Sequence, residues 1–336
     1  FAAGTYRIER EVTFDARDAG EPGRTITYAA ASGAKVVISG GEALPAWQTT
    51  PNGRWTCTTA SNRDPMEQLW VNDRRAPRAR SLQRGKPYTL LQSLEAENLV
   101  STGKDGHLYE QVLRVDPSDL AAFRTARGEE VGDAVINLFH KWDNTRRHIR
   151  AVDADAGLIV IRGHAVKPHN PLDHHTGFIL ENLPALLDEP GEWFHARTGE
   201  LTYWPRSDEQ PATATAVRPV AERFLVLAGT RAQPVSHLRF SGLRFYHARG
   251  VAATVPFEPN QAAVQSVDAA IVARHARDVA FIDCEVAHVG SYAISLREGC
   301  RRVTIEQCLL TDLGAGGVKI GTTRDRSEEH TSELQS

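Results

Sequence analysis

The segments VAFIDCEV, which begins at Val279, and VTIEQCLL, which begins at Val303, repeat one pattern of apolar side chains at an interval of 24 residues. The segment LRFSGLRF, which begins at Leu238, shows the same pattern 41 residues before the first of them. Apolar residues at every second position predict short strands with one buried face. Two such strands, separated by a two-residue bend and repeated at a fixed interval, predict a solenoid.

The second half of each repeat follows the same interval. The residues that match there, 24 positions apart, are Ile294 with Val318, Leu296 with Ile320, and Gly290 with Gly314. A leucine-rich repeat is disfavoured because its Leu/Asn spacing is missing, and a helical repeat because no 3.6-residue period is present. The sequence therefore predicts an all-β, right-handed parallel β-helix in which equivalent side chains stack from rung to rung.

Two local features follow from this alignment. The interval of 41 residues exceeds one rung by 17, and residues 250–266, with two prolines and little periodicity, are predicted to be a loop that accounts for the excess. Cys284 and Cys308 occupy the same inward position. They are predicted to be stacked, buried thiols, with a disulfide as the less favoured alternative.

The rest of the chain divides into segments that differ in their hydrophobic periodicity and composition. Short alternating pieces up to residue 94 predict the first rungs or a cap of the solenoid, and the rungs are predicted to resume at 221–325. Residues 95–220 show no 24-residue period and predict an inserted, mixed but mostly β domain, with a hairpin over 191–205 that turns at Thr198-Gly199. Residues 326–336, RSEEHTSELQS, resemble a translated sequencing-library adapter, so we expect a fragment truncated at both ends.

Composition narrows the classes of partner. The chain of 336 residues has a formal net charge of −3, which offers no basic footprint for nucleic acid. No run of 18 apolar residues exists, so no membrane span is predicted. Four cysteines are too few for a disulfide scaffold. We expect a monomer without a cofactor.

A row of polar residues follows the apolar ones. Two positions beyond the last apolar residue of each strand pair, the alignment places His247, His288 and Asp312. Rungs lie about 4.8 Å apart, and retaining glycosidases need two carboxyl groups about 5–5.5 Å apart. We predict Asp312 and His288 as catalytic residues and His247 as a substrate-binding residue, with a partner carboxylate on the following rung. The alternative is that Asp312 is an ordinary turn residue.

Other polar and aromatic groups give weaker signals. Asp283 and Glu306 lie near the bend and are expected to face solvent, and Glu285 is a further carboxylate. The arginine cluster at positions 74, 75, 78 and 80 predicts a solvated face, an ion-pair network or a contact with an acidic sugar, and Arg80 is the predicted substrate-binding residue.

The histidines at positions 164, 169, 174 and 175 lack ligand spacing, so a polar loop is favoured over a metal site. Trp142, Trp193 and Trp204 are residues that stack on sugars in some proteins, but the core of the inserted domain is the favoured place for them.

Five phrases together show a family resemblance: KVVISGG, QLWVNDRRAPRAR, LDEPGEWFHARTGELTYWP, HLRFSGLRFYHA and TDLGAGGVKIG. In this order they resemble β-helix enzymes related to glycoside hydrolase family 141, which have a pectin-lyase-like fold and an insertion domain. The resemblance implies a secreted or periplasmic glycosidase that acts on a polysaccharide or oligosaccharide. A polysaccharide lyase is the second alternative, although the histidines of the row argue against its calcium site. A non-catalytic carbohydrate-binding solenoid is the third.

Overall fold

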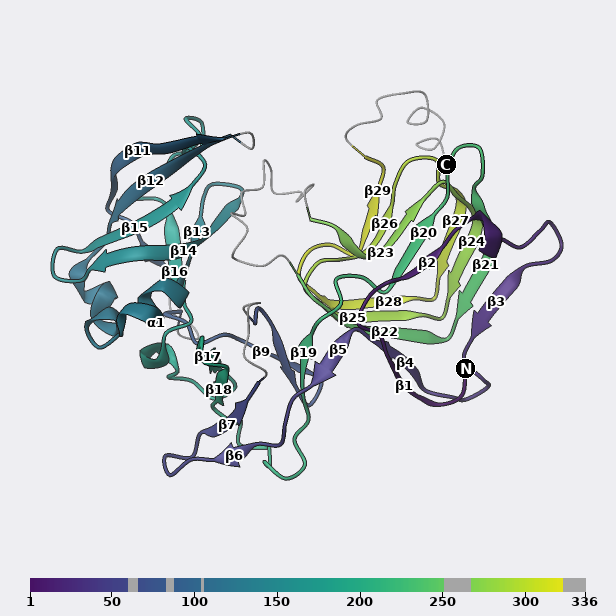
Figure 1. The fold of residues 1–336 in the computed structure, drawn as a ribbon, viewed down its shortest axis with the longest axis horizontal. Coiled ribbons are helices and arrows are strands. Elements are labelled where there is room, and N and C mark those ends of the chain that lie inside the picture. The colour runs from purple at the N-terminus through teal and green to yellow at the C-terminus, as the bar shows by residue number, and fades with distance from the viewer. Residues whose placement is uncertain (60–65, 83–87, 104–105, 251–266, 323–336) are drawn as a thin grey trace. The chain divides into compact units, whose positions relative to one another are not determined.

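The computed structural model describes residues 1–59, 66–82, 88–103, 106–250 and 267–322. The chain forms two compact units, which are described separately (Figure 1). Unit 1 comprises Phe1–Ala43, Val217–Gly250 and Gln265–Ser336, and unit 2 comprises Leu44–Ala216 with residues 251–264. The loop expected at 250–266, beyond Gly250, and the adapter-like tail at 326–336 lie outside the described residues.

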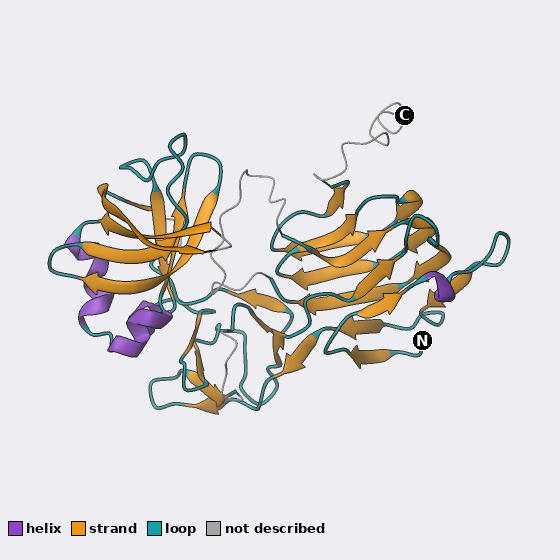
Figure 2. Cartoon of the chain, turned by 45° about the horizontal axis from the view of Figure 1, so that its top comes forward, coloured by secondary structure: helices purple, strands orange, loops and turns teal. Residues whose placement is uncertain are grey.

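Unit 1 is a right-handed parallel β-helix whose sides are three parallel sheets (Figure 2). The first sheet, here called sheet A, has the order β1 (Gly4–Arg7), β4 (Val36–Ser39), β22 (Leu243–Ala248), β25 (Glu285–Val289) and β28 (Leu309–Leu313). The second has the order β2 (Val12–Phe14), β20 (Leu225–Ala228), β23 (Ala269–Arg274), β26 (Tyr292–Leu296) and β29 (Val318–Ile320). The third has the order β27 (Arg301–Glu306), β24 (Ala276–Ile282), β21 (Val235–Ser241) and β3 (Ile26–Ala29). The unit also contains η1 (Ala16–Asp18) and the antiparallel pair of β5 (Gly41–Ala43) with β19 (Ala216–Pro219).

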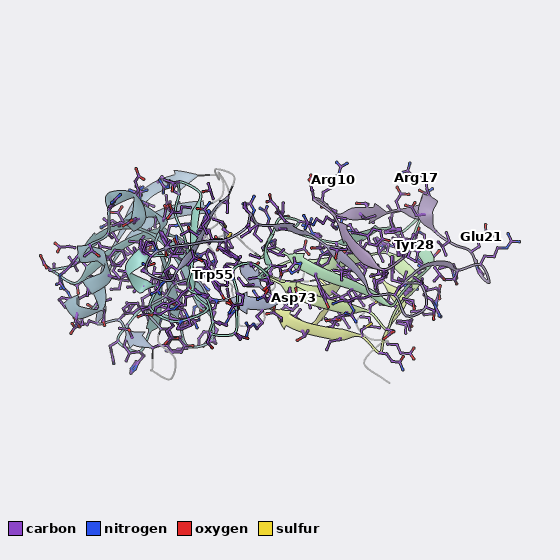
Figure 3. The ribbon with its side chains drawn as sticks, turned by 90° about the horizontal axis from the view of Figure 1, so that it is seen from below. Arg10, Arg17, Glu21, Tyr28, Trp55 and Asp73 are labelled. Carbon is purple, nitrogen blue, oxygen red and sulfur yellow. The ribbon has the colours of Figure 1, made fainter. Side chains whose placement is uncertain are left out.

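The register of these sheets confirms the sequence alignment. Phe240 pairs with Phe281, and Phe281 pairs with Ile305. The rings of Phe240 and Phe281 are stacked with centroids 5.1 Å apart, and Tyr28 continues the stack at 5.5 Å from Phe240. Figure 3 shows Tyr28 among the strands of the solenoid. Burying one such ring contributes about 1.5–3 kcal/mol, so this column is a main source of stability for unit 1.

The first two strands of sheet A, β1 and β4, come from residues that precede unit 2 in the sequence. On β4, Val36 pairs with Leu243 and Ile38 pairs with Phe245. Among the residues described between β4 and β22, none adds a strand to sheet A. Cys284 is buried in the core and Cys308 packs against it, and both are free thiols, as predicted.

Unit 2 is mostly antiparallel. Its larger sheet has the order β10 (Thr89–Leu90), β16 (Gly177–Glu181), β13 (Val135–Phe139), β14 (Asn144–Asp153), β15 (Leu158–Gly163), β12 (Gly106–Arg114) and β11 (Ser93–Gly103). A second sheet has the order β17 (Trp193–His195), β18 (Glu200–Tyr203), β7 (Trp55–Thr58) and β6 (Gln48–Thr49). The unit also holds the hairpin of β8 (Leu69–Val71) with β9 (Arg74–Ala76), and the helices η2 (Pro117–Arg124), α1 (Gly128–Asp133) and η3 (Pro184–Leu186). The hairpin predicted at Thr198-Gly199 is present as β17 and β18.

The boundary of the insertion differs from the prediction. Unit 2 begins at residue 44 in the structure rather than at 95, and it ends at 216 rather than at 220. The strands from β6 to β9 have the same alternating pattern as the solenoid rungs, but they pair in antiparallel fashion. Alternation shows that a segment is a strand and does not show which strand it pairs with. No helix of the described residues is long and apolar enough to cross a membrane.

Candidate active site

The predicted polar row is present on sheet A of unit 1. In β22, β25 and β28 the residues just before the row, Tyr246, Ala287 and Thr311, pair with one another. The residues just after it, Ala248, Val289 and Leu313, pair in the same way. His247, His288 and Asp312 therefore occupy equivalent positions on three successive rungs.

The backbone at the row is unusual. His247, His288 and Asp312 have φ values of 67°, 58° and 49°, in the left-handed region. Residues other than glycine seldom adopt this conformation, and Asn, Asp and His are enriched among those that do. Strict alternation from Phe245 would point His247 into the core. Instead, Phe245 and Ala248 both belong to the core, and two residues separate them. The left-handed residue thus acts as a one-residue insertion in each strand and keeps the row outside the core.

The two predicted catalytic residues touch each other. His288 Nδ1 lies 2.8 Å from Asp312 Oδ2. The side chains are 13% and 27% exposed, so they are partly desolvated and remain accessible from outside. A carboxylate that accepts a hydrogen bond is favoured in its ionised form. Nδ1 is therefore the ring nitrogen of His288 that faces the carboxylate.

His247 is the most buried member of the row. It is 5% exposed, and its Nδ1 lies 3.0 Å from Ser39 Oγ. Burial, followed by the charge of neighbouring His288, lowers the pKa of His247 to about 3, although Asp312 opposes this effect. Its ring is stacked on that of His288 with centroids 5.3 Å apart. A neutral imidazole is therefore held against one face of His288.

A tyrosine supports His288 from another side. The ring of Tyr246 meets the ring of His288 edge to face at 4.9 Å. Tyr246 packs with Val37 and Ala287 in a small cluster outside the main core. Burial and a hydrogen bond with Glu285 raise the pKa of Tyr246 to about 12, so its hydroxyl stays protonated. Stacking, edge contact and hydrogen bond together fix the His288 ring.

Glu285 places a second carboxylate on the strand that carries His288. Its Oε2 lies 3.5 Å from Arg244 Nε, and it hydrogen-bonds Tyr246. No role was predicted for Glu285 from the sequence, and neither Ser39 nor Tyr246 was predicted to belong to the site. Extending the repeat across the insertion would have found Ser39, because KVVIS continues the pattern and Ser39 pairs with Tyr246. Asp283 and Glu306 are exposed at the bend, as expected.

Arg80 lies in unit 2, whereas the row belongs to unit 1. It forms a β-bridge with Glu181. Burial raises the pKa of nearby Glu192 to about 7, and the charge of Arg80 opposes this rise only in part. Other members of the arginine cluster form ion pairs: Arg74 with Asp208 and Glu209, and Arg78 with Glu67. Two of the four arginines thus take part in ion pairs, and Arg74 is also exposed to solvent.

No group of three or more His, Cys, Asp or Glu residues within the described part of the chain is arranged to hold a metal ion. The histidines at 174 and 175 contact each other, with ring centroids 3.9 Å apart, and His169 stacks on Trp142. Trp142 is 45% exposed, whereas Trp193 is fully buried in the core. The core position favoured from sequence therefore holds for Trp193 and is wrong for Trp142.

No family model and no curated protein matches the chain. A solved structure described as a glycoside hydrolase superposes with a TM-score of 0.74 at 22% sequence identity, over 95% of this chain and 59% of that chain. A structure described as the complex of XylC with xylose gives a TM-score of 0.30 at 14% identity, over 88% of this chain and 37% of that chain. The chain thus has a glycoside-hydrolase-like fold and spans about 59% of the first neighbour's length.

Proposed function

We propose that the chain is part of a glycoside hydrolase that cleaves a polysaccharide or oligosaccharide on the outer face of sheet A. The observation that carries this proposal is the 2.8 Å contact between His288 and Asp312 on adjacent rungs. Tyr246 and His247 hold the imidazole from two sides. Glycoside hydrolysis needs a carboxylate held in a defined geometry beside the sugar, and this contact supplies one.

The residues take distinct roles in this proposal. Asp312 is the catalytic carboxylate, and His288, whose Nδ1 lies 2.8 Å from it, positions it and relays a proton. His247 is too buried, at 5% exposure, for the substrate contact predicted from sequence. We give it a positioning role instead, as the neutral ring stacked on His288. The substrate contact of Arg80 stays a prediction.

A glycosidase uses two carboxyl groups. Our proposal is that the partner of Asp312 comes from the rung that follows β28 in sheet A, outside this chain. Glu285 is the second candidate, because it is on the same strand as His288 and its carboxylate already shares a hydrogen bond with Tyr246. Replacing Glu285 with Gln in the protein that contains this chain separates the two candidates, since turnover survives if the partner lies on the next rung.

The central test is the variant Asp312→Asn, assayed on a panel of aryl glycosides and oligosaccharides. We expect turnover to fall by at least about a hundredfold, the usual contribution of a positioned acid or base. Asp283→Asn is the matched control, because Asp283 also has a left-handed backbone, with φ of 51°, and lies exposed at the bend. Equal activity of the Asp312→Asn variant and the wild type would refute the assignment. Unsaturated products that absorb in the near ultraviolet would identify a lyase instead.

A further inference from the structure

Residues 39–41, Ser-Gly-Gly, lie just before the chain enters unit 2, and they pack closely against His247. A Cβ added at Gly40 would lie 2.8 Å from the carbonyl oxygen of His247, and one added at Gly41 would lie 2.9 Å from its Cβ. The backbone N–H of Gly40 donates to the carbonyl oxygen of Tyr246 at 2.9 Å. Side chains at these two positions would block so close an approach. The two glycines therefore bring the side chain of Ser39 up to the His247 ring.

The hydroxyl of Ser39 makes two contacts with described residues. Its Oγ accepts the backbone N–H of Gly41 at 3.2 Å and lies 3.0 Å from Nδ1 of His247. Ser39 is 4% exposed, and a buried hydroxyl proton without an acceptor is costly. Of these two contacts, only Nδ1 can accept that proton. Ser39 therefore donates to Nδ1, and the proton of the neutral His247 ring lies on Nε2.

This hydrogen bond opposes a positive charge on His247. A protonated imidazole carries N–H on both nitrogens, so Nδ1 could no longer accept the proton of Ser39. A hydrogen bond made only to the neutral form of a group disfavours its charged form. Burial and the charge of His288 act in the same direction on the pKa of His247, and Asp312 acts against them. The remaining titratable group that meets the ring is Tyr246, edge to face at 5.9 Å.

We propose that Ser39 is a positioning residue of the active site, whose hydroxyl holds His247 as the neutral tautomer with the proton on Nε2. No positive charge then forms on the ring that is stacked on His288 at 5.3 Å. A charge there would repel a proton carried by His288. The effect on turnover rests on the proposed function, whereas the tautomer of His247 can be observed without it.

The direct test is nuclear magnetic resonance of the chain labelled with ¹⁵N in its histidine rings, between pH 7 and pH 4. The variant His247→Asn identifies the signals of His247. In the wild type we expect Nε2 to be protonated and Nδ1 to be unprotonated over this range. In Ser39→Ala the ring should take up its second proton at a pH about 0.5–1 unit higher. The charged fraction at pH 4 should therefore be several times larger.

The matched control is Ser295→Ala. Ser295 is a fully buried serine of unit 1, and its Oγ has no hydrogen-bond partner in the part of the chain that the structure describes. This variant removes a buried hydroxyl from another sheet and should leave the His247 signals unchanged. Ser39→Thr keeps the hydroxyl and should restore the wild-type ring state.

Turnover of the protein that contains this chain gives a second measurement. The ratio of wild-type to Ser39→Ala kcat should grow several times between pH 7 and pH 4, because charge on His247 accumulates only in acid. KM should change little, since Ser39 is buried. In the His247→Asn background, Ser39→Ala should have no further effect on this pH profile.

Three results would overturn the role of Ser39. They are a wild-type His247 protonated on Nδ1, a Ser39→Ala ring that titrates as in the wild type, and a loss of turnover that is the same at every pH. A shifted ring titration, found together with full turnover of Asp312→Asn, would support the hydrogen bond and refute the proposed function. The two failures are therefore distinguishable.

Discussion

Unit 1 and unit 2 bury their apolar side chains in different ways. In unit 1, equivalent residues on successive rungs stack into columns, such as Tyr28, Phe240 and Phe281. In unit 2, antiparallel sheets enclose separate cores, and arginines that lie far apart in the sequence share buried carboxylates. A repeat makes each residue's neighbour predictable from its register, whereas a network of unique contacts carries no such signal.

The ion-pair network of unit 2 centres on Glu67. Its Oε2 accepts hydrogen bonds from Arg78 Nη2 at 3.0 Å and from Arg146 Nη1 at 2.7 Å. Arg146 also pairs with Glu181 at 3.3 Å. Burial alone would lower the pKa of Arg146, but Glu67 and Glu181 outweigh it and hold that pKa above its ordinary value. Each charge in this group is therefore stabilised chiefly by its partners.

The two units can be followed separately by spectroscopy. All six tryptophans, at positions 47, 55, 70, 142, 193 and 204, belong to unit 2. Tryptophan emission therefore reports unfolding of unit 2, while far-ultraviolet circular dichroism reports both units.

The largest effect is expected in the stacked core of unit 1. Phe281→Ala removes a ring that is 1% exposed and stacked on Phe240. It should lower the free energy of unfolding by about 3–5 kcal/mol, measured by urea titration with circular dichroism, while the tryptophan transition keeps its midpoint. Ile320→Ala, at a residue 72% exposed, is the control and should change little. A tryptophan transition that shifts equally would show that the units unfold as one.

The next effect is expected in the network of unit 2. Glu67→Gln leaves the guanidinium groups of Arg78 and Arg146 without the charge they share, which should cost about 3 kcal/mol. The shift should be seen in the tryptophan transition. Glu110→Gln removes one carboxylate of a more exposed pair with Arg162 and should cost at most about 1 kcal/mol. Equal costs for the two variants would contradict the central place given to Glu67.

A smaller effect is expected where two rungs approach closely. A Cβ added at Gly314 would collide with the backbone of Gly290 on the preceding rung. Gly314→Ala should destabilise unit 1 by about 1–3 kcal/mol, the usual cost of overpacking. Gly128→Ala is the control, because a Cβ at Gly128 meets open space and the change should be neutral. Gly33 is unsuitable as a control, because its φ of 72° would itself strain an alanine. Unchanged stability of the Gly314→Ala variant would argue against this rung contact.

The smallest effect is expected from the pH dependence of the stability of unit 1, counted per pH unit. The folded pKa of His247, about 3, lies below its ordinary value of 6.5, so the unfolded chain binds the proton more tightly. Its contribution to stability is complete above pH 6.5 and is lost as pH falls toward 3, by at most about 1.4 kcal/mol per pH unit. Unfolding free energies of wild type and His247→Asn, measured between pH 7 and pH 4, should converge as pH falls. Parallel curves would exclude a buried, neutral His247.

Much of unit 1 was predictable because its interactions recur. The 24-residue interval between Val279 and Val303 equals the length of one rung. The pairing of Phe281 with Ile305 that this interval predicts is observed. The row of His247, His288 and Asp312 followed from the same register. The start of unit 2 was not predictable, because the short strands before residue 95 alternate like rungs and their antiparallel partners are set by distant contacts.

The sequence by itself determined the repeat, the parallel stacking and the equivalence of three polar positions, because a fixed period imposes the same environment on every rung. Only the tertiary structure decided how those positions act. Three features depend on contacts between residues with no fixed spacing. They are the left-handed backbone that keeps His247 out of the core, the stacking of His247 on His288, and the exposure of Trp142 on a turn held by a hydrogen bond to Asn170. Such contacts form only when the whole chain has folded, so no local pattern records them.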